Sequence, residues 1–180
     1  MKKIMFLHGF FASGQCQPAL ALREAFEGRA EVISPDLPTH PKEALTLIRD
    51  VIDRERPDVL VGNSCGSFYA QMVAPVVGVP ALLGNPHFRM TDFLSARIGR
   101  HEYKSKRLDG RQEFVIDESL IAEFAEMEAH QFDCYNPYYK IRYGESSESR
   151  TRWQGLSLCF WSTTTARFIF PVPIPQRQKR

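Results

Sequence analysis

The stretch Gly62-Asn63-Ser64-Cys65-Gly66 decides the fold that this sequence predicts. It directly follows a short apolar run at 58–61, typical of a buried strand, and precedes an apolar segment with helical spacing. A G-x-S-x-G at such a junction is typical of a tight turn that lifts the serine hydroxyl above a parallel sheet. An ordinary Gly/Ser turn is the alternative. The context favours the first interpretation and indicates Ser64 as a nucleophile.

Strand-like and helix-like segments alternate on both sides of this turn. Strands are expected at 3–7, 30–34, 58–61 and 79–83, and helices at 18–26, 41–55, 67–77 and 118–130. This alternation predicts an α/β protein of the α/β-hydrolase type, with a doubly wound, mostly parallel sheet and helices on both faces.

A second motif, Leu7-His8-Gly9-Phe10-Phe11, closes the first expected strand. Such a loop can supply one backbone N–H of an oxyanion hole, that of Phe10, while the residue after the nucleophile, Cys65, supplies the other. Each aligned donor contributes several kcal/mol at the transition state. We expect His8 to brace this loop by hydrogen bonding and not to act as the catalytic base.

Composition narrows the class of protein. The 180 residues suit one domain, and 43% hydrophobic with 24% charged residues is ordinary for a soluble globular chain. Residues 141–180 hold seven Lys or Arg and two Glu, so residues 1–140 are mildly acidic. A nucleic-acid-binding domain would carry its basic residues on a structured face, so no nucleic acid partner is expected.

Targeting and metal-binding patterns are also missing from the sequence. The apolar run that follows Met1 stops at Leu7, too early for a signal peptide, and no run of about 18 apolar residues predicts a membrane span. The cysteines show neither CxxC nor metal-ligand spacing, which predicts free thiols, no metal site, and a reducing, cytoplasmic location. These cysteines are Cys16, Cys65, Cys134 and Cys159. No pattern fixes the oligomeric state.

Four segments in this order resemble the YqiA-like esterases, small bacterial α/β hydrolases with little or no lid. They are Met1-Lys-Lys-Ile-Met-Phe-Leu-His-Gly-Phe10, Pro35-Asp-Leu-Pro38, Gly62-Asn-Ser-Cys-Gly-Ser67 and Gly84-Asn-Pro86, and the resemblance covers about residues 1–140. It implies cofactor-free hydrolysis of a small-molecule acyl ester or thioester by a Ser-Asp-His triad. Ser64 matches the nucleophile, and Phe10 and Cys65 match the oxyanion positions.

The resemblance fails after residue 140. It implies a strand ending in a loop Asp, a helix, another strand and a Gly-x-His loop, yet residues 141–180 contain no Asp and no His. The triad acid and base are therefore not identifiable. We expect a hydrolase core at 1–140 and an aberrant, poorly structured tail at 141–180, with the C-terminal strands missing or disrupted.

Other residues could replace the missing acid and base, although a surface or loop position is expected for each. His87 could lie near the active face because it follows an expected strand. Cys65 is disfavoured as a nucleophile because its side chain should point away from the pocket if that of Ser64 points in. The charged stretch at 103–111 is expected to be a solvated loop. The candidates are His40, His87, His101, His130, Asp36, Asp92, Asp109, Asp117 and Asp133.

Two function hypotheses follow. The first is a serine hydrolase that forms an acyl-enzyme on Ser64 and is impaired here; the second is a non-catalytic hydrolase-fold domain that binds a ligand. A frameshift after Lys140 would explain the tail. With permitted codons, the neighbouring frame places an Asp across the codons of Arg150 and Thr151, and a Gly-Ser-His with its His across those of Pro173 and Ile174.

Overall fold

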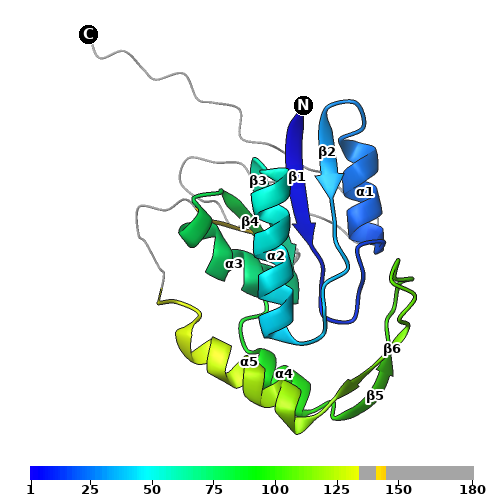
Figure 1. Cartoon of the computed structure of the whole chain (residues 1–180), viewed down its shortest axis with the longest axis vertical. Coiled ribbons are helices and arrows are strands. Elements are labelled where there is room, and N and C mark those ends of the chain that lie inside the picture. The colour runs from blue at the N-terminus through cyan, green and yellow to red at the C-terminus, as the bar shows by residue number, and fades with distance from the viewer. Residues whose placement is uncertain (134–140, 145–180) are drawn as a thin grey trace.

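The computed structural model describes residues 1–133 and 141–144. Its main sheet is parallel throughout, with strands in the order β2-β1-β3-β4-β7 (Figure 1). The strands are β1 (Lys2–Leu7), β2 (Ala30–Ile33), β3 (Val59–Asn63), β4 (Ala81–Gly84) and β7 (Ile141–Gly144). The helices between them are α1 (Gln17–Ala25), α2 (Pro41–Glu55) and α3 (Cys65–Val77).

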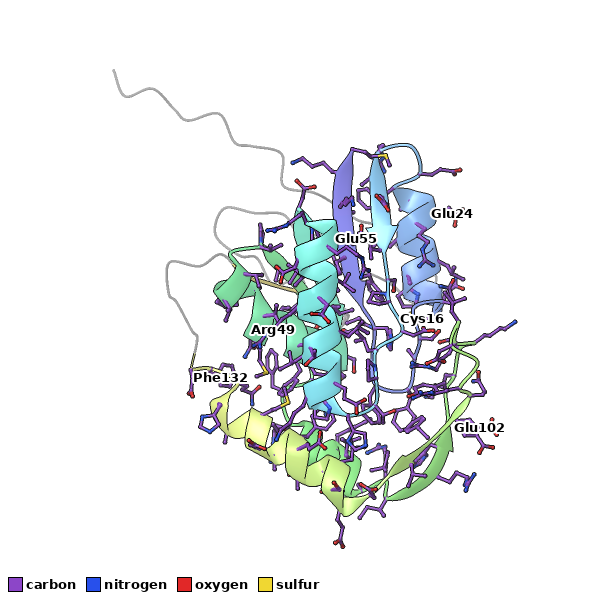
Figure 2. All side chains as sticks on the ribbon, in the orientation of Figure 1. Cys16, Glu24, Arg49, Glu55, Glu102 and Phe132 are labelled. Carbon is purple, nitrogen blue, oxygen red and sulfur yellow. The ribbon has the colours of Figure 1, made fainter. Side chains whose placement is uncertain are left out.

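Helices cover both faces of this sheet. Successive side chains of a strand point to opposite faces, so Ile4 and Phe6 of β1 pack against α1, whereas Met5 and Leu7 belong to the larger core beneath α2 and α3. Side chains fill the layers between sheet and helices, and Cys16 lies at the start of α1 (Figure 2). The predicted α/β-hydrolase architecture with helices on both faces is therefore confirmed.

A long insertion separates β4 from β7. It contains α4 (Met90–Ser95), an antiparallel hairpin of β5 (Gly99–Glu102) and β6 (Glu113–Ile116), and α5 (Glu118–His130). Figure 1 shows this insertion beyond the end of the sheet toward which β1 and β2 point. The carboxyl ends of parallel strands are where α/β folds place their sites, so the insertion adjoins the expected site.

Several element boundaries agree with the sequence expectations. Helices α2 and α5 have the expected bounds, and α3 begins two residues earlier, immediately after Ser64. Helix α4 and the hairpin were not predicted, because six-residue and four-residue elements are too short to show a period. Strand β7 comprises four residues that were assigned to the tail, and residues 145–180 lie outside the described part. Among the helices of residues 1–133 and 141–144, none is long and apolar enough to span a membrane.

Candidate active site

Ser64 occupies a strained turn between β3 and α3. Its φ of 55° and ψ of −120° lie outside the regions that residues with side chains ordinarily adopt. Two backbone hydrogen bonds hold the turn. Ser64 N–H donates to Gly84 O, at the end of β4, at 3.0 Å, and Ser67 N–H donates to Ser64 O at 2.9 Å. Helix α3 starts at Cys65, so the N–H groups of its first turn lie next to the serine. This is the strand-turn-helix geometry expected of a nucleophile.

The two glycines of the motif are required by close backbone approach. A Cβ on Gly66 would lie 1.9 Å from Leu7 O, and one on Gly62 would lie 2.5 Å from Gly66 O. Both neighbours are main-chain atoms that cannot move aside without displacing β1 or α3. The motif therefore packs the start of α3 directly onto β1.

We expect Gly66→Ala to lower the free energy of unfolding by at least about 4 kcal/mol, the range of severe packing defects. The matched control is Gly110→Ala, where φ is +77° but nothing lies within 4 Å of the added methyl group. That variant should lose only about 1 kcal/mol, the cost of the left-handed backbone. Urea unfolding of both variants measures the difference, and equal losses would contradict the packing explanation.

The loop after β1 lies against Ser64. A Cβ placed on Gly9 would be 3.3 Å from the Cβ and 3.7 Å from the Oγ of Ser64, so the Gly9 backbone faces the hydroxyl. His8 is 2% exposed, and its Nε2 accepts the Leu37 N–H at 2.9 Å while its Nδ1 lies 2.8 Å from Gly9 O. Both ring nitrogens thus hold the loop, as the sequence predicted, and neither can serve Ser64.

Burial lowers the pKa of His8 from 6.5 to about 4; Arg107 lowers it further, while the Gly9 carbonyl and Asp36 act in the opposite direction. Between these pH values the unfolded chain binds a proton that folded His8 does not. The free energy of unfolding should therefore fall by about 3 kcal/mol as pH drops from 6.5 to 4. Denaturant unfolding at several pH values, with His8→Gln as the variant that cannot titrate, measures this. Parallel pH dependence in the two proteins would contradict it.

A cavity of about 230 Å³ opens at Ser64. Its walls are mostly apolar, and the insertion supplies three of the lining residues, so a segment between β4 and β7 forms part of the cavity wall. The lining residues are Gly9, Phe10, Phe11, Ala12, Ser64, Met90, Phe93 and Lys104. The aromatic rings of the wall pack edge to face. The centroid of the Phe11 ring lies 5.5 Å from that of Phe10 and 6.0 Å from that of Phe93.

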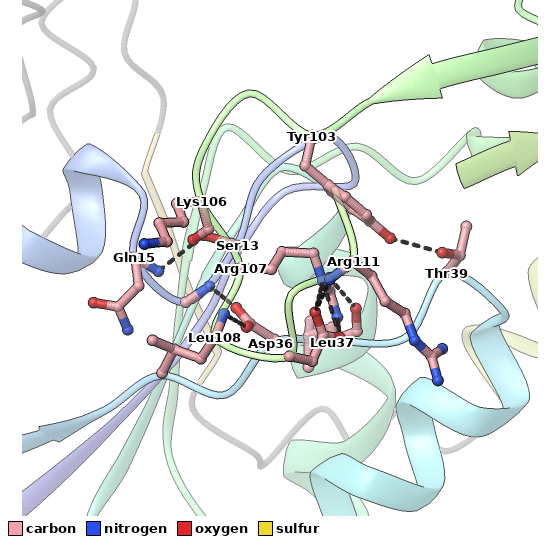
Figure 3. A network of polar contacts seen from close by, with 12 residues as sticks. Ser13, Gln15, Asp36, Leu37, Thr39, Tyr103, Lys106, Arg107, Leu108 and Arg111 are labelled. Carbon is pink, nitrogen blue, oxygen red and sulfur yellow. Dashed lines mark hydrogen bonds and ion pairs between the residues drawn. The ribbon is translucent and has the colours of Figure 1, made fainter. Parts of the chain in front are cut away.

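A polar network fastens the insertion to the sheet loops (Figure 3). Arg107 is 5% exposed, pairs with Asp109 and donates to Leu37 O at 3.0 Å. Asp36 accepts from Gly14 N–H at 2.7 Å and from Leu108 N–H at 2.6 Å. The prediction of a solvated loop is therefore wrong for Arg107 and for Tyr103, whose ring lies 4.5 Å beneath the guanidinium. A hydrogen bond formed between distant loops, such as that from Arg107 to Leu37 O, leaves no periodic signal in the sequence.

Cys65 does not compete with Ser64 as a nucleophile. Its side chain is 1% exposed and belongs to the core formed by α2, α3 and α5. Burial raises the pKa of the thiol to about 12, so the reactive thiolate is suppressed. The expected orientation of the Cys65 side chain away from the pocket is thus observed.

Most of the substitute acids and bases hold structural contacts elsewhere. Asp117 caps α5 by accepting the Leu120 N–H at 2.8 Å, and Asp36 and Asp109 belong to the polar network. The remaining pairs are His40 with Glu123, Asp92 with Arg89, His130 with Asp133, and His101 with the carbonyl of Arg97. His87 differs from these, because its backbone N–H donates to Ser64 O at 3.4 Å.

The described residues provide neither a cluster of metal-ligating side chains nor an exposed thiol. Residues 1–133 and 141–144 contain no group of three His, Cys, Asp or Glu side chains placed to hold a metal ion. Cys16 and Cys65 are free and buried, and Cys134 and Cys159 lie outside the described residues. Among the described residues, the polar side chains that line the cavity are those of Ser64 and Lys104.

The fold and the turn at Ser64 define the class of protein as an α/β hydrolase in architecture. The profile of the uncharacterised protein family UPF0227 matches residues 3–144, and the chain belongs to this family. The resemblance to YqiA-like proteins is thereby confirmed.

Two solved structures are similar to this chain, and the first of them shows the shared fold. Est1E from Butyrivibrio proteoclasticus, determined with ferulic acid bound, superposes with a TM-score of 0.52 at 14% identity, over 77% of this chain and 65% of that one. Mouse alpha/beta hydrolase domain-containing protein 10 gives 0.49 at 14% identity, over 69% and 60%. This chain spans less than two thirds of the length of either protein.

Proposed function

We propose that this protein is a serine hydrolase of the carboxylesterase type, which cleaves short acyl esters or thioesters through an acyl-enzyme on Ser64. The observation that carries the proposal is the strained backbone of Ser64 at the mouth of an apolar cavity. Strain of this kind persists only where the surrounding structure enforces it, and it is concentrated at active sites.

The N–H groups of Phe10 and Cys65 are proposed to stabilise the oxyanion. Gly9 faces the Ser64 hydroxyl, and α3 begins at Cys65, so one donor belongs to each side of the serine. In the reaction, Ser64 Oγ bonds to the acyl carbon, the carbonyl electron pair moves to oxygen, and these N–H groups would receive the charge. The alcohol or thiol then leaves, and water releases the acid.

The proposed substrate carries a short acyl chain. A cavity of about 230 Å³ is smaller than the roughly 300–1,000 Å³ typical of pockets for drug-sized ligands. Its aromatic walls suit a small apolar acyl chain. The free thiols Cys16 and Cys65 accord with the proposed cytoplasmic location.

We also propose that residues beyond Lys140 are read in a shifted frame, which removes the triad acid and base and impairs this chain. The family match supports this, because it ends at residue 144, close to the proposed junction. The alternative of a non-catalytic binding domain remains an outcome of the assay.

Hydrolysis of p-nitrophenyl butyrate by purified protein tests the proposed function. We expect turnover above the buffer rate that falls as the acyl chain lengthens from butyrate to decanoate, because longer chains exceed the cavity. The absence of turnover with every ester, together with retained binding of a short-chain ester analogue, would instead establish the binding domain.

A further inference from the structure

The described part of the structure contains every histidine of the chain. The sequence has five, and all of them lie within residues 1–133. Four of them use ring nitrogens in contacts away from Ser64: His8 with Leu37 and Gly9, His40 with Glu123, His101 with Arg97, and His130 with Asp133. His87 is the remaining one.

The sheet places His87 beside the nucleophile. Strands β3 and β4 run parallel in a register that pairs Asn63 with Gly84, so the residues following both strands leave the same edge together. Ser64 follows β3 directly, and His87 lies three residues beyond β4. The hydrogen bond from His87 N–H to Ser64 O, at 3.4 Å, joins the two loops.

The ring of His87 contacts the wall of the Ser64 cavity. It meets the Phe93 ring edge to face, with 4.8 Å between centroids, and Phe93 lines the cavity together with Ser64. Its Nε2 is buried and has no hydrogen-bond partner among the described residues. A buried nitrogen without a partner costs free energy, and such atoms in folded proteins call for an explanation.

We propose that His87 is the general base of this chain and accepts the Ser64 proton on Nε2. The inference rests on the proposed function, since it assigns the proton acceptor of that same reaction. As Ser64 Oγ bonds to the acyl carbon, its proton passes to His87. The resulting imidazolium protonates the leaving alcohol or thiol as its bond to the acyl carbon breaks. Water then attacks the acyl-enzyme, gives its proton to His87, and Ser64 recovers a proton as the acid departs.

This arrangement is a dyad within the described residues. Within residues 1–133 and 141–144, no ion pair or hydrogen bond joins the His87 ring to a carboxylate, and its Nε2 has no hydrogen-bond partner, so the imidazole lacks the group that fixes its tautomer in a triad. In a serine protease, loss of that carboxylate's charge lowers kcat by about 10⁴. The inference thus explains how this chain could retain slow activity without the triad residues.

The rate of Ser64 modification by a fluorophosphonate probe tests the inference. His87→Ala should slow labelling of Ser64 by about 10²–10⁴-fold, the usual contribution of a general base. Added imidazole should restore part of the rate, which a purely structural role for His87 would not allow. His130→Ala, which removes an exposed histidine paired with Asp133, should label at the wild-type rate.

His87→Gln provides a second variant, since glutamine accepts a hydrogen bond but cannot take up the proton. If either His87 variant melts like the wild type and labels Ser64 at the wild-type rate, the inference is overturned while the proposed function stands. If the wild type is not labelled at Ser64 at all, the proposed function fails, and His87 has no proton to accept.

Discussion

Ser64→Ala is expected to eliminate ester hydrolysis except for what the oxyanion hole and substrate binding supply, which in triad enzymes is roughly 10³–10⁴-fold over water. The alanine lacks the hydroxyl that forms the acyl-enzyme, whereas the turn itself is held by backbone hydrogen bonds that the substitution leaves in place. Initial rates with p-nitrophenyl butyrate, compared with the wild type, measure the loss.

Ser95→Ala is the matched control. Its hydroxyl donates to Thr91 O at 2.8 Å on the exposed side of α4, and it takes no part in the cavity lining. Its activity should equal that of the wild type. Full activity of the Ser64 variant, with normal folding of both proteins, would show that hydrolysis takes place elsewhere.

Restoring the reading frame should produce the largest gain. Inserting one base at codon 140 is predicted to return a loop Asp and a Gly-Ser-His segment, so that Ser64 regains a base whose imidazole is held by a carboxylate. The acid alone contributes about 10⁴ in rate in a serine protease. We expect kcat for p-nitrophenyl butyrate to rise by that order and the melting temperature to rise as well.

The restored chain also distinguishes the two candidate general bases, His87 and the restored triad histidine. With a triad histidine present, His87→Ala should change its rate little, whereas the same substitution should disable the present chain.

Sequencing the gene around codon 140 shows whether the neighbouring frame encodes the Asp and the His. A frame without them, or a restored protein no more active or stable, would refute the frameshift.

The sequence predicted the sheet and the long helices because period and strand alternation are local signals. The bounds of α2 agree because Pro41 begins it and the apolar face through Ile52 is unbroken. The insertion was not predictable in this way. Its hairpin is stabilised by long-range contacts, such as Arg107 with Leu37, that have no counterpart in neighbouring residues.

The candidate site also has a part that local sequence motifs predict and a part that depends on long-range contacts. Ser64 and the loop at Phe10 are marked by contiguous motifs, so their neighbourhood could be predicted from the sequence. The cavity wall at Phe93 and the position of His87 could not, because both depend on how the insertion folds back over the sheet edge. The spacing from Gly84 hinted at His87, yet its unpartnered nitrogen is visible only in three dimensions.

If Ser64 Oγ is the nucleophile, active-site labelling should detect it most directly. The native chain is treated with a fluorophosphonate probe, digested, and mapped by mass spectrometry. We expect one probe per chain, on the peptide that contains Ser64, and no modification after heat denaturation. A label on a different serine of the folded protein would contradict it.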